Sequence, residues 1–146
     1  YASTRARDVI AAWLEHLYLH AGHHHPEAVT THFARNLRFA FQPLPAEQAR
    51  RHLGDWFAAW REGQRAPLAF YPETAWAWIQ EDKEQAARNA WEAAYGEGQD
   101  RNWRLALRDR FSTTADVLAD PRFQHWRETL LRPLCRQFMV SQTGGD

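Results

Sequence analysis

Three carboxylates surround a glycine turn in the second half of the chain, and they are the residues whose types and spacing could do chemistry. Glu97 stands between Gly96 and Gly98, with Glu92 before the turn and Asp100 after it. Convergent carboxylates can hold the divalent metal of a nuclease, usually with a lysine or another base nearby. The single lysine lies in a separate charged run, and the glycine spacing matches neither a Walker loop nor a dinucleotide fingerprint. We therefore favour a structural turn, with a metal-dependent nuclease that uses Glu92, Glu97 and Asp100 as the alternative.

Histidines are concentrated near the start of the chain. His16 and His20 are four residues apart, so both rings can face one side of a helix. Such a pair is half of a zinc site, but no carboxylate or cysteine at ligand spacing completes it. We expect a partly buried, hydrogen-bonded His16 and no bound metal or cofactor, with a zinc-binding interaction module as the second alternative. The remaining histidines of this region are expected in and around a solvated loop: His23, His24, His25 and His32.

Arginines supply the candidate binding face. Arg101, Arg104 and Arg108 fall on one side of the helix expected after the glycine turn, and Arg50 and Arg51 on the outer side of an earlier helix. Arginines interleaved with tryptophan can hold phosphates and stack on bases. They can equally pair with the acidic residues of a partner subunit, or form an ordinary solvated face. We take these five residues as candidates for contact with DNA or a partner.

Composition limits the classes of function. The 146 residues carry no net charge, although 17 of the 18 basic residues are arginine, so no global basic field attracts nucleic acid. The only cysteine is Cys135, which excludes an internal disulfide, suits a reducing cytoplasm and indicates a core or interface thiol. No apolar run approaches the roughly 20 residues needed to span a bilayer, and no signal peptide is recognisable. The chain begins at Tyr1 rather than methionine, as a fragment would.

Periodicity predicts a mostly helical chain with a small hairpin. Residues 5–22 show helical spacing of apolar residues and end at a glycine, whereas residues 28–44 alternate with period two on either side of a turn. Residues 45–140 are expected to be mainly helical, and residues 141–146 to form a frayed tail.

Proline, glycine and capping residues divide the helical part of the chain into separate helices. A second helix begins near Pro45 and ends at Gly63, with Phe57 and Trp60 on its expected buried face. A short extended run at 67–72 precedes a helical zone over 73–95, with a break expected within residues 80–83. Asp100 is expected to N-cap a helix that runs through Arg110, and Asp120, just before Pro121, is expected to N-cap the last helix. That last helix is expected to kink at Pro133 and to include Phe138.

Several stretches, taken in order, carry a family resemblance: IAAWLEHL at 10–17, FQPL at 41–44, AEQA at 46–49, WREG at 60–63 followed by PL at 67–68, ARNAWE at 87–92, and GEG at 96–98 leading to WRL at 103–105. In this order and spacing they resemble the C-terminal region of the gamma subunit of exodeoxyribonuclease V, the RecC family. The resemblance runs from about residue 5 to residue 137. Its signature residues are expected to be structural: Trp13, His16, Gly63, Trp91, Gly96, Glu97, Gly98 and Trp103.

The resemblance implies a fold and a role. The family's C-terminal domain is similar to the PD-(D/E)xK, or restriction-endonuclease-like, nucleases but lacks their catalytic residues. It serves in a helicase–nuclease complex with RecB-like and RecD-like partners, which processes double-strand DNA ends for recombinational repair. By that comparison Tyr1 ends a core strand, and no lysine follows it in Ala2, Ser3 or Thr4.

The expected fold class is α+β, as the second half of such a degenerate domain within one domain over residues 1–146. The expected function is scaffolding and DNA guidance without catalysis.

Overall fold

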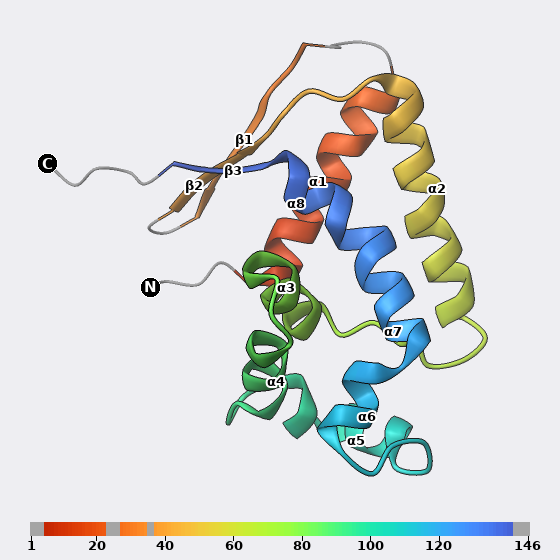
Figure 1. Cartoon of the computed structure of the whole chain (residues 1–146). Coiled ribbons are helices and arrows are strands. Elements are labelled where there is room, and N and C mark those ends of the chain that lie inside the picture. Colours follow the sequence, from red (N-terminus) through yellow and green to blue (C-terminus); the bar gives the residue numbers. More distant parts are fainter. Residues whose placement is uncertain (1–4, 23–26, 35–36, 142–146) are drawn as a thin grey trace, which may run out of the picture. The chain divides into compact units, whose positions relative to one another are not determined.

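The computed structural model describes residues 5–22, 27–34 and 37–141. They divide into two compact units, which we call the terminal unit (residues 1–58 and 133–146) and the central unit (residues 59–132). Figure 1 gives the order of the elements along the chain. Among the described residues, no helix is both long and apolar enough to cross a bilayer.

The terminal unit begins with the predicted helix and hairpin. Helix α1 (Ala6–Ala21) ends where Gly22 donates its backbone N–H to the carbonyl of His20. Strands β1 (Thr30–Ala34) and β2 (Leu37–Phe41) pair in an antiparallel manner, with Thr30 opposite Phe41. The prediction of a helix over 5–22 and a hairpin within 28–44 is therefore confirmed.

A third strand in the terminal unit corrects the sequence analysis. Helix α8 (Arg132–Gln137) stops before the aromatic residue that was predicted to continue it, and β3 (Phe138–Ser141) pairs antiparallel with β2. The sheet order is β1-β2-β3, and the three strands lie together in Figure 1. The pairing brings Phe138 opposite Phe41, a contact between segments so distant in sequence that local periodicity cannot detect it. Residues 142–146 of the expected tail lie outside the described residues.

Helix α2 (Ala46–Gly63) has the predicted bounds but a different buried face. Ala49 and Ala59 are buried, whereas Phe57 and Trp60 are each 58% exposed. The prediction that these two aromatic side chains are buried is wrong. Periodicity finds an apolar stripe on a helix but does not say which part of it a neighbour covers.

The central unit is helical throughout its regular elements. Helices α3 (Pro72–Glu81) and α4 (Glu84–Glu92) are separated at Asp82, whose φ of 50° lies in the left-handed region that aspartate tolerates. The break predicted within residues 80–83 is confirmed. The residues before α3, predicted as a short extended run, form no strand with another described segment. The remaining elements follow in order: η1 (Glu97–Gln99), α5 (Arg101–Leu107), α6 (Thr114–Ala119), α7 (Pro121–Trp126) and the π-helical turn η2 (Arg127–Leu131).

Side-chain caps begin the short helices of the central unit. Asp100 accepts the backbone N–H groups of Asn102 and Trp103, and Asp120 accepts that of Arg122. Both predicted N-caps are confirmed, because an aspartate before a helix satisfies N–H groups that have no partner within the helix. Helix α5 ends at Leu107, three residues before the predicted end, and the π-helical turn lies just before the proline where a kink was expected.

Candidate functional site

Glu97 holds the N-terminus of α3 from across the central unit. Its Oε1 accepts the backbone N–H of Glu73 at 3.2 Å, and its Oε2 accepts that of Thr74 at 3.0 Å. Burial raises the pKa of this carboxyl, while the hydrogen bonds from Thr74 and Glu73 oppose that rise. A carboxylate at a helix N-terminus meets the positive end of the helix dipole. The carboxylate between the two glycines therefore joins the turn to α3.

The two glycines allow the turn to lie against Trp91. A Cβ added to Gly98 would lie 2.5 Å from Nε1 of Trp91 and 2.6 Å from its carbonyl oxygen. A Cβ on Gly96 would lie 2.6 Å from the same carbonyl oxygen and would also overlap that of Ala90. Neither glycine has a positive φ, so the requirement here is space rather than backbone freedom.

The other two carboxylates of the predicted cluster have separate roles. Asp100 caps α5 through its Oδ1, and the exposed Glu92 lies 3.9 Å from Nη1 of Arg88. Within the part of the chain that the structure describes, no three His, Cys, Asp or Glu residues are grouped so that they could hold a metal ion. The nuclease alternative on Glu92, Glu97 and Asp100 thus lacks the convergent site that it requires.

His16 is fully buried in the terminal unit and uses both ring nitrogens. Nε2 lies 2.8 Å from the carbonyl oxygen of Gln42, and Nδ1 lies 2.7 Å from the hydroxyl of Thr30. Because a carbonyl only accepts, Nε2 carries the proton and Nδ1 accepts from the hydroxyl. Burial, and to a smaller extent the neighbouring His20, lower the pKa of His16 to about 4, although the hydrogen bond to Gln42 opposes the shift. His16 is therefore neutral near pH 7, and its one lone pair is occupied.

His20 completes the pair that suggested a zinc site. The two rings lie 4.2 Å apart between centroids, as their spacing on one helix face predicted. Nδ1 of His20 donates to the carbonyl of His16 at 2.9 Å, and His32 stacks on Phe39 with 5.3 Å between centroids. With His16 committed to hydrogen bonds, the zinc alternative has no coordinating pair. The expectation for His23, His24 and His25 falls outside the described residues.

Of the aromatic signature residues, Trp13 and Trp91 are buried in the cores of their units, whereas Trp103 is partly exposed. Trp13 is completely buried, tilted against Phe41 at 5.1 Å and stacked on His16 at 5.5 Å. In the central unit, Trp91 and Trp103 both pack edge-to-face against the ring of Tyr71, at centroid distances of 4.9 and 4.8 Å.

Tyr71 is the residue of this core that the sequence analysis missed. It is fully buried, it lies 5.2 Å from the ring of Phe123, and burial raises its pKa to about 12. The sequence placed it only in a short extended run between prolines. Gly63 is the last residue of α2, as predicted, and a Cβ there would make only an ordinary contact with Leu68 at 3.7 Å.

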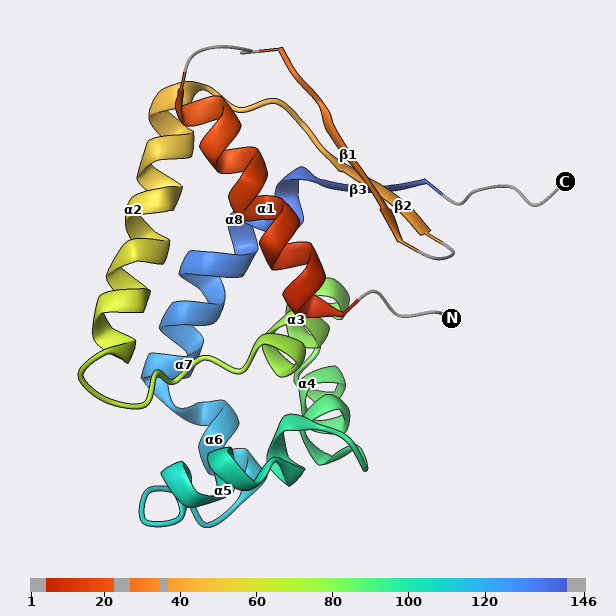
Figure 2. The ribbon, with the colours of Figure 1, turned by 180° about the vertical axis from the view of Figure 1, so that it is seen from behind.

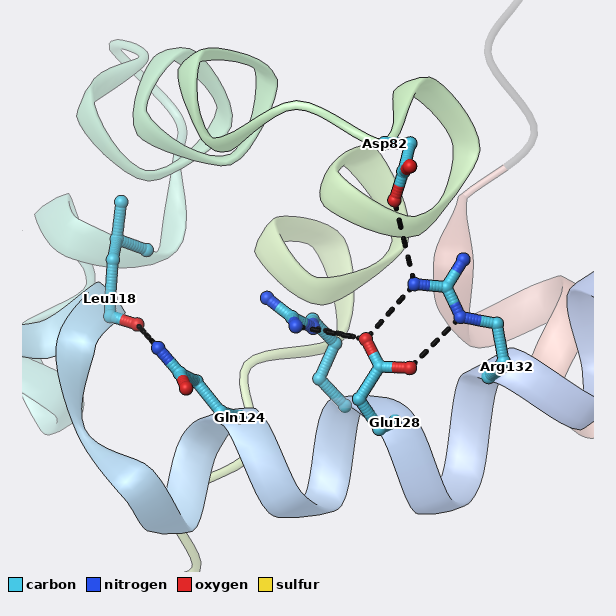
Figure 3. A network of polar contacts seen from close by, with 6 residues as sticks. Asp82, Leu118, Gln124, Glu128 and Arg132 are labelled. Carbon is cyan, nitrogen blue, oxygen red and sulfur yellow. Dashed lines mark hydrogen bonds and ion pairs between the residues drawn. The ribbon is translucent and has the colours of Figure 1, made fainter.

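A second set of polar contacts links α3 to the last helical segments of the central unit. Glu128 accepts hydrogen bonds from Arg127 at 2.8 Å and from Arg132 at 2.9 and 3.0 Å, and Arg132 lies 3.5 Å from Asp82. Figure 3 shows these contacts. Hydrogen bonds, first from Arg132 and then from Arg127, lower the pKa of Glu128. Arg127 also lies over the ring of Trp78, 3.9 Å from its centroid. The network serves packing within the unit.

Arg101, Arg104 and Arg108 are all exposed, the first two on α5 and the third at its C-cap, one residue beyond the end of the helix. They border a shallow hollow of about 350 Å³, together with Gln99 and Leu105. Arg50 and Arg51 are exposed on α2, in the other unit. The structure therefore brings three of the five candidate arginines together and assigns the other two to a different unit.

A second hollow, of about 420 Å³, is lined by residues of both α5 and α6, which lie at the same end of the central unit in the ribbon views (Figures 1 and 2). It shares Arg104 and Arg108 with the first. Among the described residues, neither lining contains an aspartate or glutamate. The sequence analysis missed this hollow because its further lining residues come from separate elements: Trp91, Gly98, Trp103, Leu107, Phe111, Ser112, Thr113, Thr114 and Val117.

Residues 1–83 match the profile of the RecC C-terminal domain. This chain belongs to the RecC C-terminal domain family. It is also similar to the Escherichia coli (strain K12) protein described as RecBCD enzyme subunit RecC, with 37% identity over 67 residues. That alignment covers 46% of this chain and 6% of the relative. The profile match ends before the glycine turn, so the role of GEG at 96–98 as a signature of the RecC family stays a prediction, as does the nuclease-like ancestry of the fold.

Proposed function

We propose that this chain acts as a non-catalytic part of a RecC-type subunit in a helicase–nuclease complex that processes double-strand DNA ends for recombinational repair. In this role it supports RecB-like and RecD-like partner subunits and guides a separated DNA strand. The assignment to such a complex rests on the family, because the E. coli relative is described as a subunit of the RecBCD enzyme. One observation carries the non-catalytic part: the best candidate for a catalytic carboxylate, Glu97, is committed to the backbone of α3.

Exposed aromatic side chains support the scaffolding role. In the terminal unit, Tyr18 and Phe33 are 79% and 77% exposed, and Phe57 of α2 is 58% exposed. Such side chains mark a surface that a partner protein covers where they gather into one apolar patch, because leaving a large apolar area in water is unfavourable.

The arginines of α5 support the DNA-guiding role. Arg101, Arg104 and Arg108 are exposed along α5 and its C-cap, beside hollows with no acidic lining among the described residues. Each guanidinium group in such a row can donate two hydrogen bonds to one phosphate group.

Replacing all three arginines with alanine tests this proposal in the assembled complex. Each phosphate contact to a single strand contributes roughly 0.7 to the dependence of log affinity on log salt, so we expect the slope to fall by about 2. Titration of DNA binding at several salt concentrations measures it. The matched control replaces three exposed arginines elsewhere with alanine, Arg7, Arg61 and Arg65, and should leave the slope unchanged.

Two results would count against the proposal. An unaltered slope in the α5 variant removes the DNA-guiding part. Cleavage of linear DNA by the purified chain with Mg²⁺ or Mn²⁺, abolished by Glu97→Gln, removes the non-catalytic part and restores the nuclease alternative.

A further inference from the structure

The hollow between α5 and α6, which we call the α5–α6 hollow, is large enough for a small planar ligand. Its volume of about 420 Å³ falls within the range of sites that bind small molecules and cofactors, roughly 300–1,000 Å³. Helix α5 contributes Trp103, Arg104 and Leu107 to one side, together with its C-cap residue Arg108, and α6 contributes residues including Val117 to the other. Residues of α4, η1 and the segment that joins the two helices complete the lining, and all of these residues belong to the central unit.

Its walls combine flat apolar surface with hydroxyl groups. Trp103 and Phe111 are partly exposed, and Val117 is buried. Ser112 and Thr114 add hydroxyl groups that can donate and accept hydrogen bonds. Aromatic faces stack on any nucleobase, and hydroxyl groups suit the polar edge of a base.

The charge at its rim is positive. Arg104 and Arg108 line both this hollow and its neighbour, in which Arg101 continues the row. Two acidic side chains lie near the rim: Asp109, whose pair with Arg108 at 3.3 Å is largely exposed and contributes little, and Asp116, which accepts hydrogen bonds from the backbone N–H and the hydroxyl of Thr113 in the capping box of α6. Along the axis of α5, Arg104 and the C-cap residue Arg108, whose backbone is still helical, differ in position by about 6 Å, since each residue of a helix rises about 1.5 Å. Successive phosphates of a stretched strand can therefore be met by successive arginines.

We propose that the α5–α6 hollow receives one unstacked base of a single DNA strand, with its ring against Phe111 and Trp103 and its flanking phosphates on Arg104 and Arg108. This inference rests on the proposed DNA-guiding role and names the form of DNA that the site takes. Duplex DNA keeps its bases stacked inside the helix, so only a separated strand offers a free ring. The carboxylates of an acidic peptide would pair with the arginines, but they offer no flat ring to stack on Trp103 and Phe111.

The test compares two probes of equal length, a thymidine oligonucleotide and the same phosphodiester chain without bases. With the wild-type chain we expect the oligonucleotide to bind about ten-fold more tightly, because each stacked base adds to the phosphate contacts. Phe111→Leu keeps an apolar side chain but removes the flat ring, so it should abolish most of this preference. Phe111→Tyr, which retains the ring, should preserve it, and thermal unfolding of both variants checks that the fold is intact.

A photocrosslinking thymidine analogue gives a second readout that does not depend on substitution. We expect its crosslinks to map to peptides that contain Trp103 or Phe111. Equal binding of the two probes, or crosslinks elsewhere, overturns the base site while the salt dependence carried by the arginines still supports the proposed function. Equally tight binding of a polyglutamate peptide would assign the arginines to an acidic partner and also overturn it. If replacing Arg101, Arg104 and Arg108 with alanine leaves the salt dependence of DNA binding unchanged, the proposed DNA role itself is removed.

Discussion

At the scale of single residues, the surroundings of a side chain decide whether it serves chemistry or architecture. Glu97 and His16 are residue types that catalyse reactions and bind metals, yet the first accepts two backbone N–H groups of α3 and the second bridges a hydroxyl and a carbonyl. In both cases the polar group is buried or partly buried and already satisfied by hydrogen bonds. Leaving such a group without a partner costs about 1–3 kcal/mol, which is the physical reason for the structural role.

The glycine turn makes a steric prediction. Gly98→Ala should destabilise the chain by about 1–3 kcal/mol, because the added Cβ overlaps Trp91 and forces the turn to move. Gly54→Ala is the control: no atom lies within 4 Å of its added Cβ in the middle of α2, so this change should stabilise by about 0.5–1 kcal/mol. Urea unfolding measures both, and a Gly98 variant as stable as the wild type contradicts the role given to this glycine.

His16 makes a prediction about pH. Its pKa is about 4 in the folded chain and 6.5 as a free side chain, so between these values the unfolded chain binds the additional proton. The stability that His16 contributes is present above pH 6.5 and is lost as the pH falls towards 4, by about 3 kcal/mol in total. The difference between wild type and His16→Gln in urea unfolding at several pH values measures this loss.

A direct titration accompanies that experiment. The ring resonances of His16 should show no protonation above pH 5 in the folded chain, whereas a solvent-exposed histidine titrates near 6.5. A His16 that titrates near 6.5 is incompatible with the buried hydrogen bonds described above.

At the scale of helices and strands, features set by neighbouring residues could be predicted from the sequence, whereas pairing between distant segments could not. The N-caps at Asp100 and Asp120 and the helix break at Asp82 were predictable, because each depends on residues within a few positions. Strand β3 was not, because the segment Phe138–Ser141 becomes a strand only by pairing with β2 from the other end of the chain. The same sequence continues a helical pattern when read alone.

Phe138 tests the value of that pairing. Its ring lies 5.5 Å from that of Phe39 and 6.0 Å from that of Phe41. Phe138→Ala should cost about 2 kcal/mol of stability, less than the roughly 3–5 kcal/mol for truncating a fully buried phenylalanine, because Phe138 is only partly buried. Val140→Ala, in the same strand but 52% exposed, should cost less than about 0.5 kcal/mol. Equal effects of the two changes in chemical unfolding would argue against a packed β3.

At the scale of the whole molecule, the chain leaves its first compact unit and returns to it. Residues 1–58 and 133–146 form the terminal unit, and the central unit lies between them in sequence. The match to the RecC C-terminal domain over residues 1–83 includes the buried pair of Trp13 and His16 and continues into α3. The arginines of α5 lie beyond that match, so their role depends on the structure and on the experiments proposed for them.

The sequence by itself determined the helix caps and turns, the class of the fold, the arginine row on α5 and the family, since these depend on local spacing or on ordered motifs. It also indicated a structural turn around Glu97, but not its partner. Only the tertiary structure decided that this carboxylate caps α3, that Tyr71 is the centre of an aromatic cluster, that β3 completes the sheet, and that Phe111 joins Arg104 at one hollow. The physical reason is that these features are contacts between segments distant in sequence, and the chain's local pattern carries no information about which distant segment satisfies a given group.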